Sequence, residues 1–158
     1  MKQAPKKHER MEEFVRGLDT DGDPDFHACY TGYFLCFNEG RYYEAHDVLE
    51  HLWLQTDGRD FGFYKGLIQF AGAFVHLQKQ HERPSHPKDG RRLAPACRLF
   101  VRASELLAPF APLHHRLAVG DLLDICRRKA AFLELHDYQR NPWHPEAMPQ
   151  LVLLAGAS

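Results

Sequence analysis

Two adjoining stretches of the chain place ionisable or amide side chains beside strongly apolar helix faces. His46 and Glu50 are four residues apart in the first stretch, residues 41–56, so on a helix they share one edge and lie one turn apart. A carboxylate can orient an imidazole as a general base, and the pair can also ligate a metal ion. Because an unpaired polar group against apolar surface costs roughly 2 to 7 kcal/mol, these residues indicate a built polar site.

The second stretch, residues 59–81, is apolar over much of its helical wheel, which is typical of a mostly buried helix. Its polar stripe follows one narrow edge and consists of Lys65, Gln69, Gly72 and His76. Glycine inside a helix costs about 1 kcal/mol relative to alanine, and Gly66 and Gly72 both expose backbone here. We therefore expect a neighbouring helix to approach this edge closely.

We expect the two polar edges to face each other. The resulting cluster would contain two imidazoles, one carboxylate and one amide, supplied by His46, His76, Glu50 and Gln69. Trp53 lies nearly one turn beyond Glu50 on the same helix, and its large ring would cover these groups from water. This arrangement would join two helices through a shared polar site.

These residues occur within motifs that resemble a known family. The chain reads FNEG at 37–40, YEAHDVLE at 43–50, tryptophan at 53 and GLIQ at 66–69. This order resembles domain-of-unknown-function family 309, whose signature is FN-x-G-x-(Y/F)-x-E-A-H-(E/D)-x-L-E-x-x-W followed by a G-L-I-Q helix. The resemblance extends over about residues 25–135. It implies a small all-helical bundle with no established activity.

The resemblance carries five positions onto this chain, namely His46, Glu50, Trp53, Gly66 and Gln69. Asp47 departs from the usual signature, in which glutamate is commoner at that position. The helical wheel places Asp47 opposite the apolar arc, on the solvent side, so we expect the departure to change little. His76 and the tail beyond Asp137 lie outside the signature.

Composition and charge exclude several classes of protein. The chain has 158 residues and a net charge of −1, which offers no basic field for nucleic acid or an anionic membrane. No stretch approaches the roughly 18 apolar residues that cross a bilayer, and the basic N-terminus lacks the apolar part of a secretory signal. Four scattered cysteines resemble small core residues, so a cytoplasmic protein is expected. They are Cys29, Cys36, Cys97 and Cys126.

The periodicity predicts an all-α, single-domain bundle of about five to six helices, without a strand pattern. Helices are expected at 5–18, 25–37, 41–56, 59–81, 89–108 and 121–136. Asp25 and Asp121 are the expected N-caps of two of them, and Gly40 is the expected helix end. Three parts are expected: an N-terminal helix and turn (1–24), a family-309-like bundle (25–137) and a proline-rich tail (138–158) docked by Trp143 and the 151–154 run.

Two chemical roles for the polar cluster stay open. His46, Glu50 and His76 are suitable metal ligands by type, but HExxH and Glu-x-x-His spacings are both absent, so we expect no metal and no other cofactor. A small hydrolase or lyase, metal-dependent or not, would use His46 as base, Glu50 to orient it and Gln69 to contact the substrate. No nucleophile or phosphate-binding motif accompanies them, which argues against an enzyme.

The preferred interpretation is a binding or interaction module of unknown molecular function, organised around His46, Glu50, Trp53, Gln69 and His76. The competing interpretation is structural, because a buried His–Glu–Gln network can fix helix register, with the Trp53 indole N–H satisfied inside it. Another protein or a second copy of the chain is the expected partner. Nucleic acid is disfavoured because the basic loop 79–92 lacks stacking aromatic residues. The adjacent His114 and His115 are interpreted as exposed loop residues.

Overall fold

The structure is a computed structural model that describes residues 27–155. Five α-helices make up most of this part of the chain: α2 (Ala28–Asn38), α3 (Tyr42–Trp53), α4 (Asp60–Glu82), α5 (Leu93–Leu107) and α6 (Val119–Leu135). Three short 3-10 helices accompany them: η1 (Asp89–Arg91), η2 (Ala108–Phe110) and η3 (Pro145–Ala147). The all-α prediction is confirmed. The expected N-terminal part, 1–24, with its helix at 5–18, lies outside the described residues.

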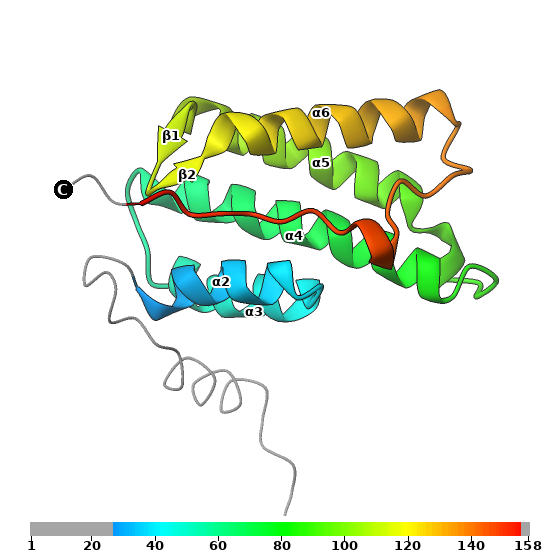
Figure 1. Cartoon of the computed structure of the whole chain (residues 1–158), viewed down its shortest axis with the longest axis horizontal. Helices are drawn as coiled ribbons and strands as arrows, with labels where there is room; N and C mark the ends of the chain where they lie inside the picture. The colour runs from blue at the N-terminus through cyan, green and yellow to red at the C-terminus, as the bar shows by residue number, and fades with distance from the viewer. Residues whose placement is uncertain (1–26, 156–158) are drawn as a thin grey trace, which may run out of the picture.

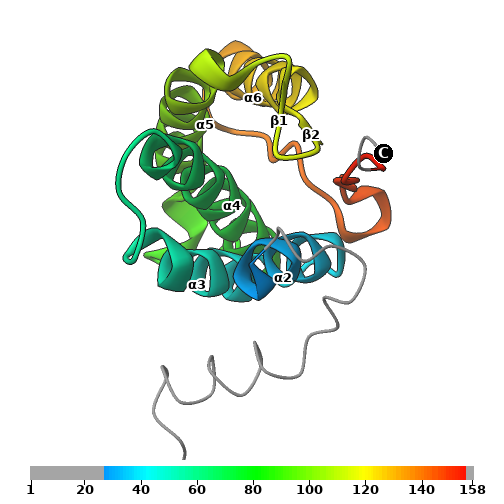
Figure 2. The same cartoon turned by 90° about the vertical axis from the view of Figure 1, so that its left-hand side faces the viewer.

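Each helix packs against the next one in the chain (Figure 1). α4 lies in the middle, with α3 and α2 to one side of it and α5 and α6 to the other. Figure 2 shows that the helices form an arc, whose open side is crossed by the chain that follows α6. Elements on either side of α4 therefore belong to one core.

Aromatic side chains fill the space between the helices. Phe37 of α2, Phe70 and Phe74 of α4 and Phe100 of α5 are all fully buried. The ring of Phe74 lies 5.2 Å from that of Phe37 and 5.3 Å from that of Phe100, centroid to centroid. Burying such a side chain contributes about 1.5 to 3 kcal/mol, so these rings hold α2 and α5 against α4.

The two α4 glycines allow a close helix approach, as predicted, but the neighbour is α5 and not α3. A Cβ atom at Gly66 would lie 2.7 Å from Cγ of Leu107, and one at Gly72 would lie 3.3 Å from Cδ1 of Leu99. Both leucines belong to α5. The glycines and the polar stripe beside them therefore lie against α5, which changes the expected geometry of the site.

The helix ends follow local backbone rules with two corrections. Gly40 has φ +76° immediately after α2, a conformation that glycine adopts freely, so the predicted end of this helix is confirmed. The N-cap of α2 is His27, whose Nδ1 accepts a backbone N–H, whereas Asp25 lies outside the described residues. α6 begins at Val119, so Asp121 lies within its first turn and is not the N-cap.

The connection between α5 and α6 contains a β-hairpin that the sequence did not predict. β1 (Leu113–His114) pairs antiparallel with β2 (Leu117–Ala118). His115 and Arg116 form the two-residue turn with φ values of +45° and +62°. Strands of two residues are too short to show an alternating pattern, which explains the wrong expectation of no strands.

The tail after α6 docks on the bundle through specific contacts. The buried indole of Trp143 donates from Nε1 to the hydroxyl of Tyr42, at 2.9 Å. The side chain of Asn38 forms two 2.7 Å hydrogen bonds with the backbone of Leu151. These contacts join residues more than a hundred positions apart, so the tail packs against the C-terminal end of α2 and the N-terminal end of α3.

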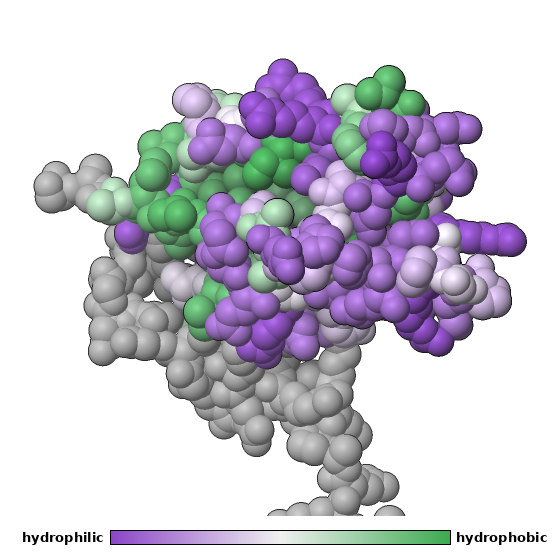
Figure 3. Space-filling model, turned by 45° about the vertical axis from the view of Figure 1, so that its right-hand side comes forward, coloured by the Kyte–Doolittle hydropathy of each residue, from purple (hydrophilic) through white to green (hydrophobic). Residues whose placement is uncertain are grey.

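The predicted apolar run of the tail is only partly buried. Leu151 lies in the core, whereas Val152 and Leu154 are exposed. Leu113 of the hairpin is also exposed, and the hairpin pairs with the tail through a bridge from Leu117 to Leu153. Figure 3 shows hydrophobic surface at the end of the molecule from which the C-terminus leaves, while the opposite end is mostly hydrophilic. We call Leu113, Val152 and Leu154 the apolar patch.

All four cysteines are buried and free, as predicted. Burial raises the pKa of the Cys29 thiol to about 11 and that of the Cys126 thiol to about 12, so both are protonated near neutral pH. Within residues 27–155, none of the helices combines the length and the apolar character that crossing a membrane would require.

Candidate functional site

The predicted pair on α3 forms a small, partly exposed group together with one further residue. Nδ1 of His46 lies 3.3 Å from Oδ1 of Asp47 and 3.5 Å from Oε2 of Glu50. Both separations are long for a charge-assisted hydrogen bond. The side chains of His46 and Glu50 are 32% and 38% exposed, so a ligand can reach both. We call these three residues the α3 cluster.

The position of Asp47 differs from the one that the helical wheel predicts. The wheel places it on the solvent side, yet its side chain is only 7% exposed. A wheel shows the direction in which a side chain leaves its own helix, but it does not show which neighbouring element covers that side. The position at which the chain departs from the family signature is therefore buried, and it contacts His46.

Trp53 does not complete the α3 cluster as predicted. Its ring stacks at a tilt on the half-exposed ring of Phe61, 5.0 Å away, at the start of α4. Its indole nitrogen is buried and has no hydrogen-bond partner among the described residues. The expected bond from this N–H to the cluster is absent, and a buried N–H without a partner costs about 1 to 3 kcal/mol.

The expected four-residue cluster does not form, because His76 lies against α5 and η1 instead of α3. Arg92 donates a hydrogen bond to Nδ1 of His76 at 3.1 Å. Burial, together with the positive charge of Arg92, lowers the pKa of His76 to about 4, so the imidazole is neutral near pH 7. Gln69 forms no hydrogen bond with His46 or Glu50 in the described structure.

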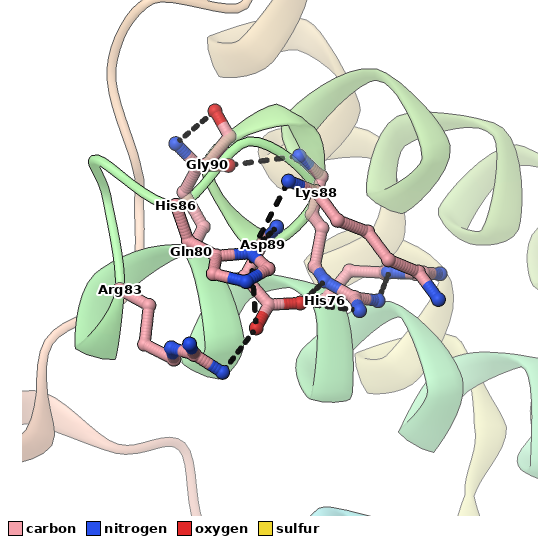
Figure 4. A network of polar contacts seen from close by, with 8 residues as sticks. His76, Gln80, Arg83, His86, Lys88, Asp89 and Gly90 are labelled. Atoms are coloured by element: carbon pink, nitrogen blue, oxygen red, sulfur yellow. Dashed lines mark hydrogen bonds and ion pairs between the residues drawn. The ribbon is translucent and has the colours of Figure 1, made fainter.

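His76 instead belongs to a network centred on a buried carboxylate (Figure 4). Asp89 accepts hydrogen bonds from Nε of Arg92 at 2.8 Å and from Nη1 of Arg83 at 3.2 Å. The backbone N–H of Asp89 donates to Nδ1 of His86 at 3.0 Å. The guanidinium groups lower the pKa of the Asp89 carboxyl, chiefly through the Arg92 hydrogen bond. Two arginines of the basic loop 79–92 are thus neutralised internally.

A second histidine–carboxylate group joins the hairpin to α4, and the sequence interpretation missed it. Nε2 of His114 donates to Oδ1 of Asp60 at 2.8 Å, and Nε2 of His115 donates to Oδ2 at 2.7 Å. The three side chains are between 21% and 33% exposed. We call them the hairpin cluster. The interpretation of both histidines as exposed loop residues is wrong, because each is only partly exposed and bonded to Asp60.

The hairpin cluster is tightly packed and electrostatically matched. The ring of His114 lies 4.7 Å from that of Phe63, and the ring of His115 is stacked 6.3 Å from that of Tyr64. Burial acts to raise the pKa of the Asp60 carboxyl, but the hydrogen bonds from His115 and His114 outweigh burial and hold it below its usual range. Asp60 is therefore ionised at neutral pH.

One signal in the sequence could have pointed to the hairpin cluster. His114 and His115 are the only adjacent histidines among the eleven in the chain. Neighbouring residues on a strand point to opposite faces, so the pair alone does not predict that both rings meet one carboxylate. The turn makes this possible, because His115 has left the strand and adopts a positive φ.

Two groups among the described residues have a composition and spacing that could hold a metal ion. One is the α3 cluster, in which Asp47 takes the place that prediction assigned to His76. The other is the hairpin cluster. The hairpin cluster offers two imidazoles and one carboxylate, and the α3 cluster offers one imidazole and two carboxylates.

Three surface cavities lie elsewhere on the described part of the chain. The first, of about 530 Å³, lies between α6 and the tail and is lined by His81, Lys129 and Trp143 among others. The others, of about 370 and 420 Å³, lie beside α5 and border Tyr138. None of the five predicted site residues lines any of these three cavities.

Comparison with known proteins supports the resemblance found in the motifs. Residues 30–86 match the family model described as Domain of unknown function (DUF309), and no curated protein or solved structure gives a significant match. The matched segment runs from α2 to the loop after α4 and contains the α3 cluster and Asp60, whereas the hairpin and the tail lie beyond it. Residues 30–86 are therefore similar to the family described as Domain of unknown function (DUF309).

Proposed function

We propose that this protein is a binding or interaction module whose contact edge is the exposed side of the α3 cluster. The observation that carries this proposal is the partial exposure of His46 and Glu50, at 32% and 38% of their side-chain surface. A histidine and a glutamate side by side provide a hydrogen-bond donor or acceptor next to a negative charge. This pair suits a polar or basic group of a partner.

The exposure of the edge weakens the purely structural interpretation. A network that fixes helix register is normally buried, because its hydrogen bonds gain strength in a low-dielectric interior. The contact between His46 and Glu50 is 3.5 Å long and largely at the surface, where an ion pair contributes about 0 to 1 kcal/mol. The pair therefore has little to offer stability.

The alternative, a small hydrolase or lyase with His46 as its base, receives less support. An enzyme needs a cavity that holds the substrate within hydrogen-bond reach of its base. The three cavities described above are lined by other residues. Gln69, the expected substrate contact, lies on the stripe of α4 that faces α5.

The apolar patch favours a protein as the partner. Leu113, Val152 and Leu154 are 56%, 70% and 45% exposed, and they belong to the hairpin and the tail, which pair through a β-bridge. Figure 3 shows hydrophobic surface at the end of the molecule from which the C-terminus leaves. Contiguous apolar surface of this kind is typical of protein interaction sites. A second copy of the chain or another protein would each fit this surface, and both remain predictions.

The test compares His46→Gln and Glu50→Gln with Glu44→Gln, a matched control on an exposed position of the same helix. Each variant is measured for thermal unfolding and for the proteins that it captures by affinity purification. The proposal expects both site variants to melt within about 2 °C of the wild type, since surface substitutions change stability little. Both should lose a partner that Glu44→Gln retains. A large loss of stability with unchanged capture would instead support the structural interpretation.

A further inference from the structure

The hairpin cluster has the composition of an open metal site, and both of its histidines lie beyond the DUF309 match. His114 and His115 each direct Nε2 at a different oxygen of Asp60, at 2.8 and 2.7 Å. The ligand atoms of the three residues all lie within 4.8 Å of one another. We propose that Asp60, His114 and His115 bind one divalent transition-metal ion of the zinc type.

The donor set is chemically appropriate for such an ion. Imidazole nitrogen and carboxylate oxygen are common zinc ligands, and three protein ligands with a free fourth position are typical of sites that keep a bound water. In a tetrahedral site with bonds of 2.0 to 2.1 Å, ligand atoms are about 3.3 Å apart. The present separations of 2.7 and 2.8 Å would need to lengthen by only about half an ångström.

Metal binding also requires a simple proton shift. In the hydrogen-bonded form, each Nε2 carries the hydrogen that it donates to Asp60. As metal ligands, both imidazoles would be neutral with the hydrogen on Nδ1, which leaves the Nε2 lone pair for the ion. Because each ring stays neutral in this change of tautomer, no net proton is gained or lost. The exposure of the three side chains, from 21% to 33%, leaves a path for the ion and for water.

The fold holds the ligands in place at an energetic cost. His115 and Arg116 adopt φ values of +45° and +62°, which for residues other than glycine cost on the order of 1 to 3 kcal/mol each. The hydroxyl of Tyr30 donates to the carbonyl oxygen of His115 at 2.8 Å and so fixes this turn. Strain of this kind is concentrated at functional sites, where preorganised ligands reduce the cost of binding.

Two arginines adjacent in sequence to the proposed ligands carry positive charges that would repel a bound cation, by an amount that falls with their distance from it. The guanidinium group of Arg59 lies over the ring of Phe110, 5.2 Å from its centroid. Nε of Arg116 donates to the carbonyl oxygen of Leu154 at 2.6 Å, on the side of the tail. Both groups are thus held by contacts outside the three proposed ligands, and the carboxylate of Asp60 faces the histidines.

The α3 cluster is the natural control for this proposal. It contains one histidine, its three residues come from one helix, and its contacts of 3.3 and 3.5 Å use Nδ1. The hairpin cluster contains one histidine from β1, one from the strained turn and a carboxylate from α4. If histidine and acid in proximity were sufficient, both clusters would bind zinc equally.

The experiment measures Zn²⁺ binding to the tag-free full chain by titration calorimetry, after removal of metal with a chelator. The variants are Asp60→Asn, His114→Gln and His115→Asn, the last chosen because asparagine tolerates positive φ. The control is His46→Gln. We expect one equivalent of Zn²⁺ for the wild type and the control, and at least about 100-fold weaker binding for each ligand variant, beyond the 10- to 100-fold effect of outer-shell changes.

A second measurement does not depend on variants that fold. Side-chain ¹⁵N NMR of the wild type during the Zn²⁺ titration should shift Nε2 of His114 and His115 and leave His46 unchanged. Absence of zinc binding, binding by the three ligand variants that is as tight as that of the wild type, or a shift confined to His46 would each overturn the proposal. Because the partner-binding test changes only α3 residues, failure of one proposal leaves the other standing.

Discussion

The α3 cluster and the hairpin cluster contain the same chemical groups but span very different chain distances. The α3 cluster lies within five consecutive residues of one helix, and its contacts measure 3.3 and 3.5 Å. The hairpin cluster joins positions 54 and 55 residues apart, and its contacts measure 2.8 and 2.7 Å. The group that is distant in the chain is the tighter one.

The two clusters owe their geometry to different sources. On a helix, the positions of residues one and four apart are set by the backbone, so their side chains can only rotate toward one another. In the hairpin cluster, the turn carrying His115 and the first turn of α4 are placed independently by the core around Phe63. Packing can bring such groups to hydrogen-bond distance without using the helical period.

The largest effect should come from the tail, which tests whether the two clusters share one core. Trp143→Ala removes a buried indole and the donor to the Tyr42 hydroxyl, so the free energy of unfolding should fall by about 3 to 5 kcal/mol. Urea denaturation measures this loss. Val152→Ala, at an exposed position of the same tail, should cost less than about 0.5 kcal/mol. If Trp143→Ala costs as little as Val152→Ala, the packing of the tail into the core is contradicted.

The contact between α4 and α5 should matter next, because α5 leads into the hairpin. Gly66→Ala places a methyl group 2.7 Å from Cγ of the fully buried Leu107, so we expect a loss of about 1 to 3 kcal/mol. Gly62→Ala meets nothing within 4 Å and should gain about 0.5 to 1 kcal/mol. Thermal unfolding distinguishes the two signs. A stabilised Gly66 variant would contradict the close helix approach.

The two clusters can be compared directly by removing one carboxylate from each, with a chelator present. Asp60→Ala removes two hydrogen bonds to a partly buried charged group and should cost about 1 to 3 kcal/mol. Glu50→Ala removes a long surface contact and should cost less than about 1 kcal/mol. Chemical denaturation gives both values. If Glu50→Ala costs as much as Asp60→Ala, the α3 cluster has a structural role after all.

The last prediction concerns the pH dependence of stability and His76, which lies outside the α3 cluster. The pKa of His76 is lowered from 6.5 to about 4 in the folded protein, so the unfolded chain takes up the proton first as pH falls. Its contribution to stability is therefore complete above pH 6.5 and is lost between about pH 6.5 and 4. His76→Gln should flatten the melting temperature against pH in that window. Val152→Ala, which removes no titratable group, should leave the curve unchanged there.

Much of the fold was predictable because the pattern that specifies a helix lies within a short stretch of sequence. The apolar periodicity of residues 41–56 and 59–81 led to α3 and α4, with ends only a few residues from those observed. Gly40 correctly predicted the end of α2, because the chain needs a left-handed backbone conformation there. The hairpin was missed because four paired residues carry too little pattern to detect.

The candidate site was predicted in part. The spacing of His46 and Glu50 correctly placed them on one edge, since a single helix decides that geometry. Their expected neighbours were wrong, because the choice between α3 and α5 as the helix beside the α4 stripe depends on which side chains fit around Gly66 and Gly72. A wheel holds no information about that choice.

Local sequence patterns were sufficient to predict the five described helices, their order and the α3 edge, because each depends on backbone hydrogen bonds and periodicity over a few residues. Three other features became visible only in the folded chain: Asp47 is buried, His76 is linked to Asp89 through Arg92, and two hairpin histidines contact Asp60. The physical reason is that packing of nonlocal surfaces sets these contacts, and its outcome depends on the shapes of all the elements together.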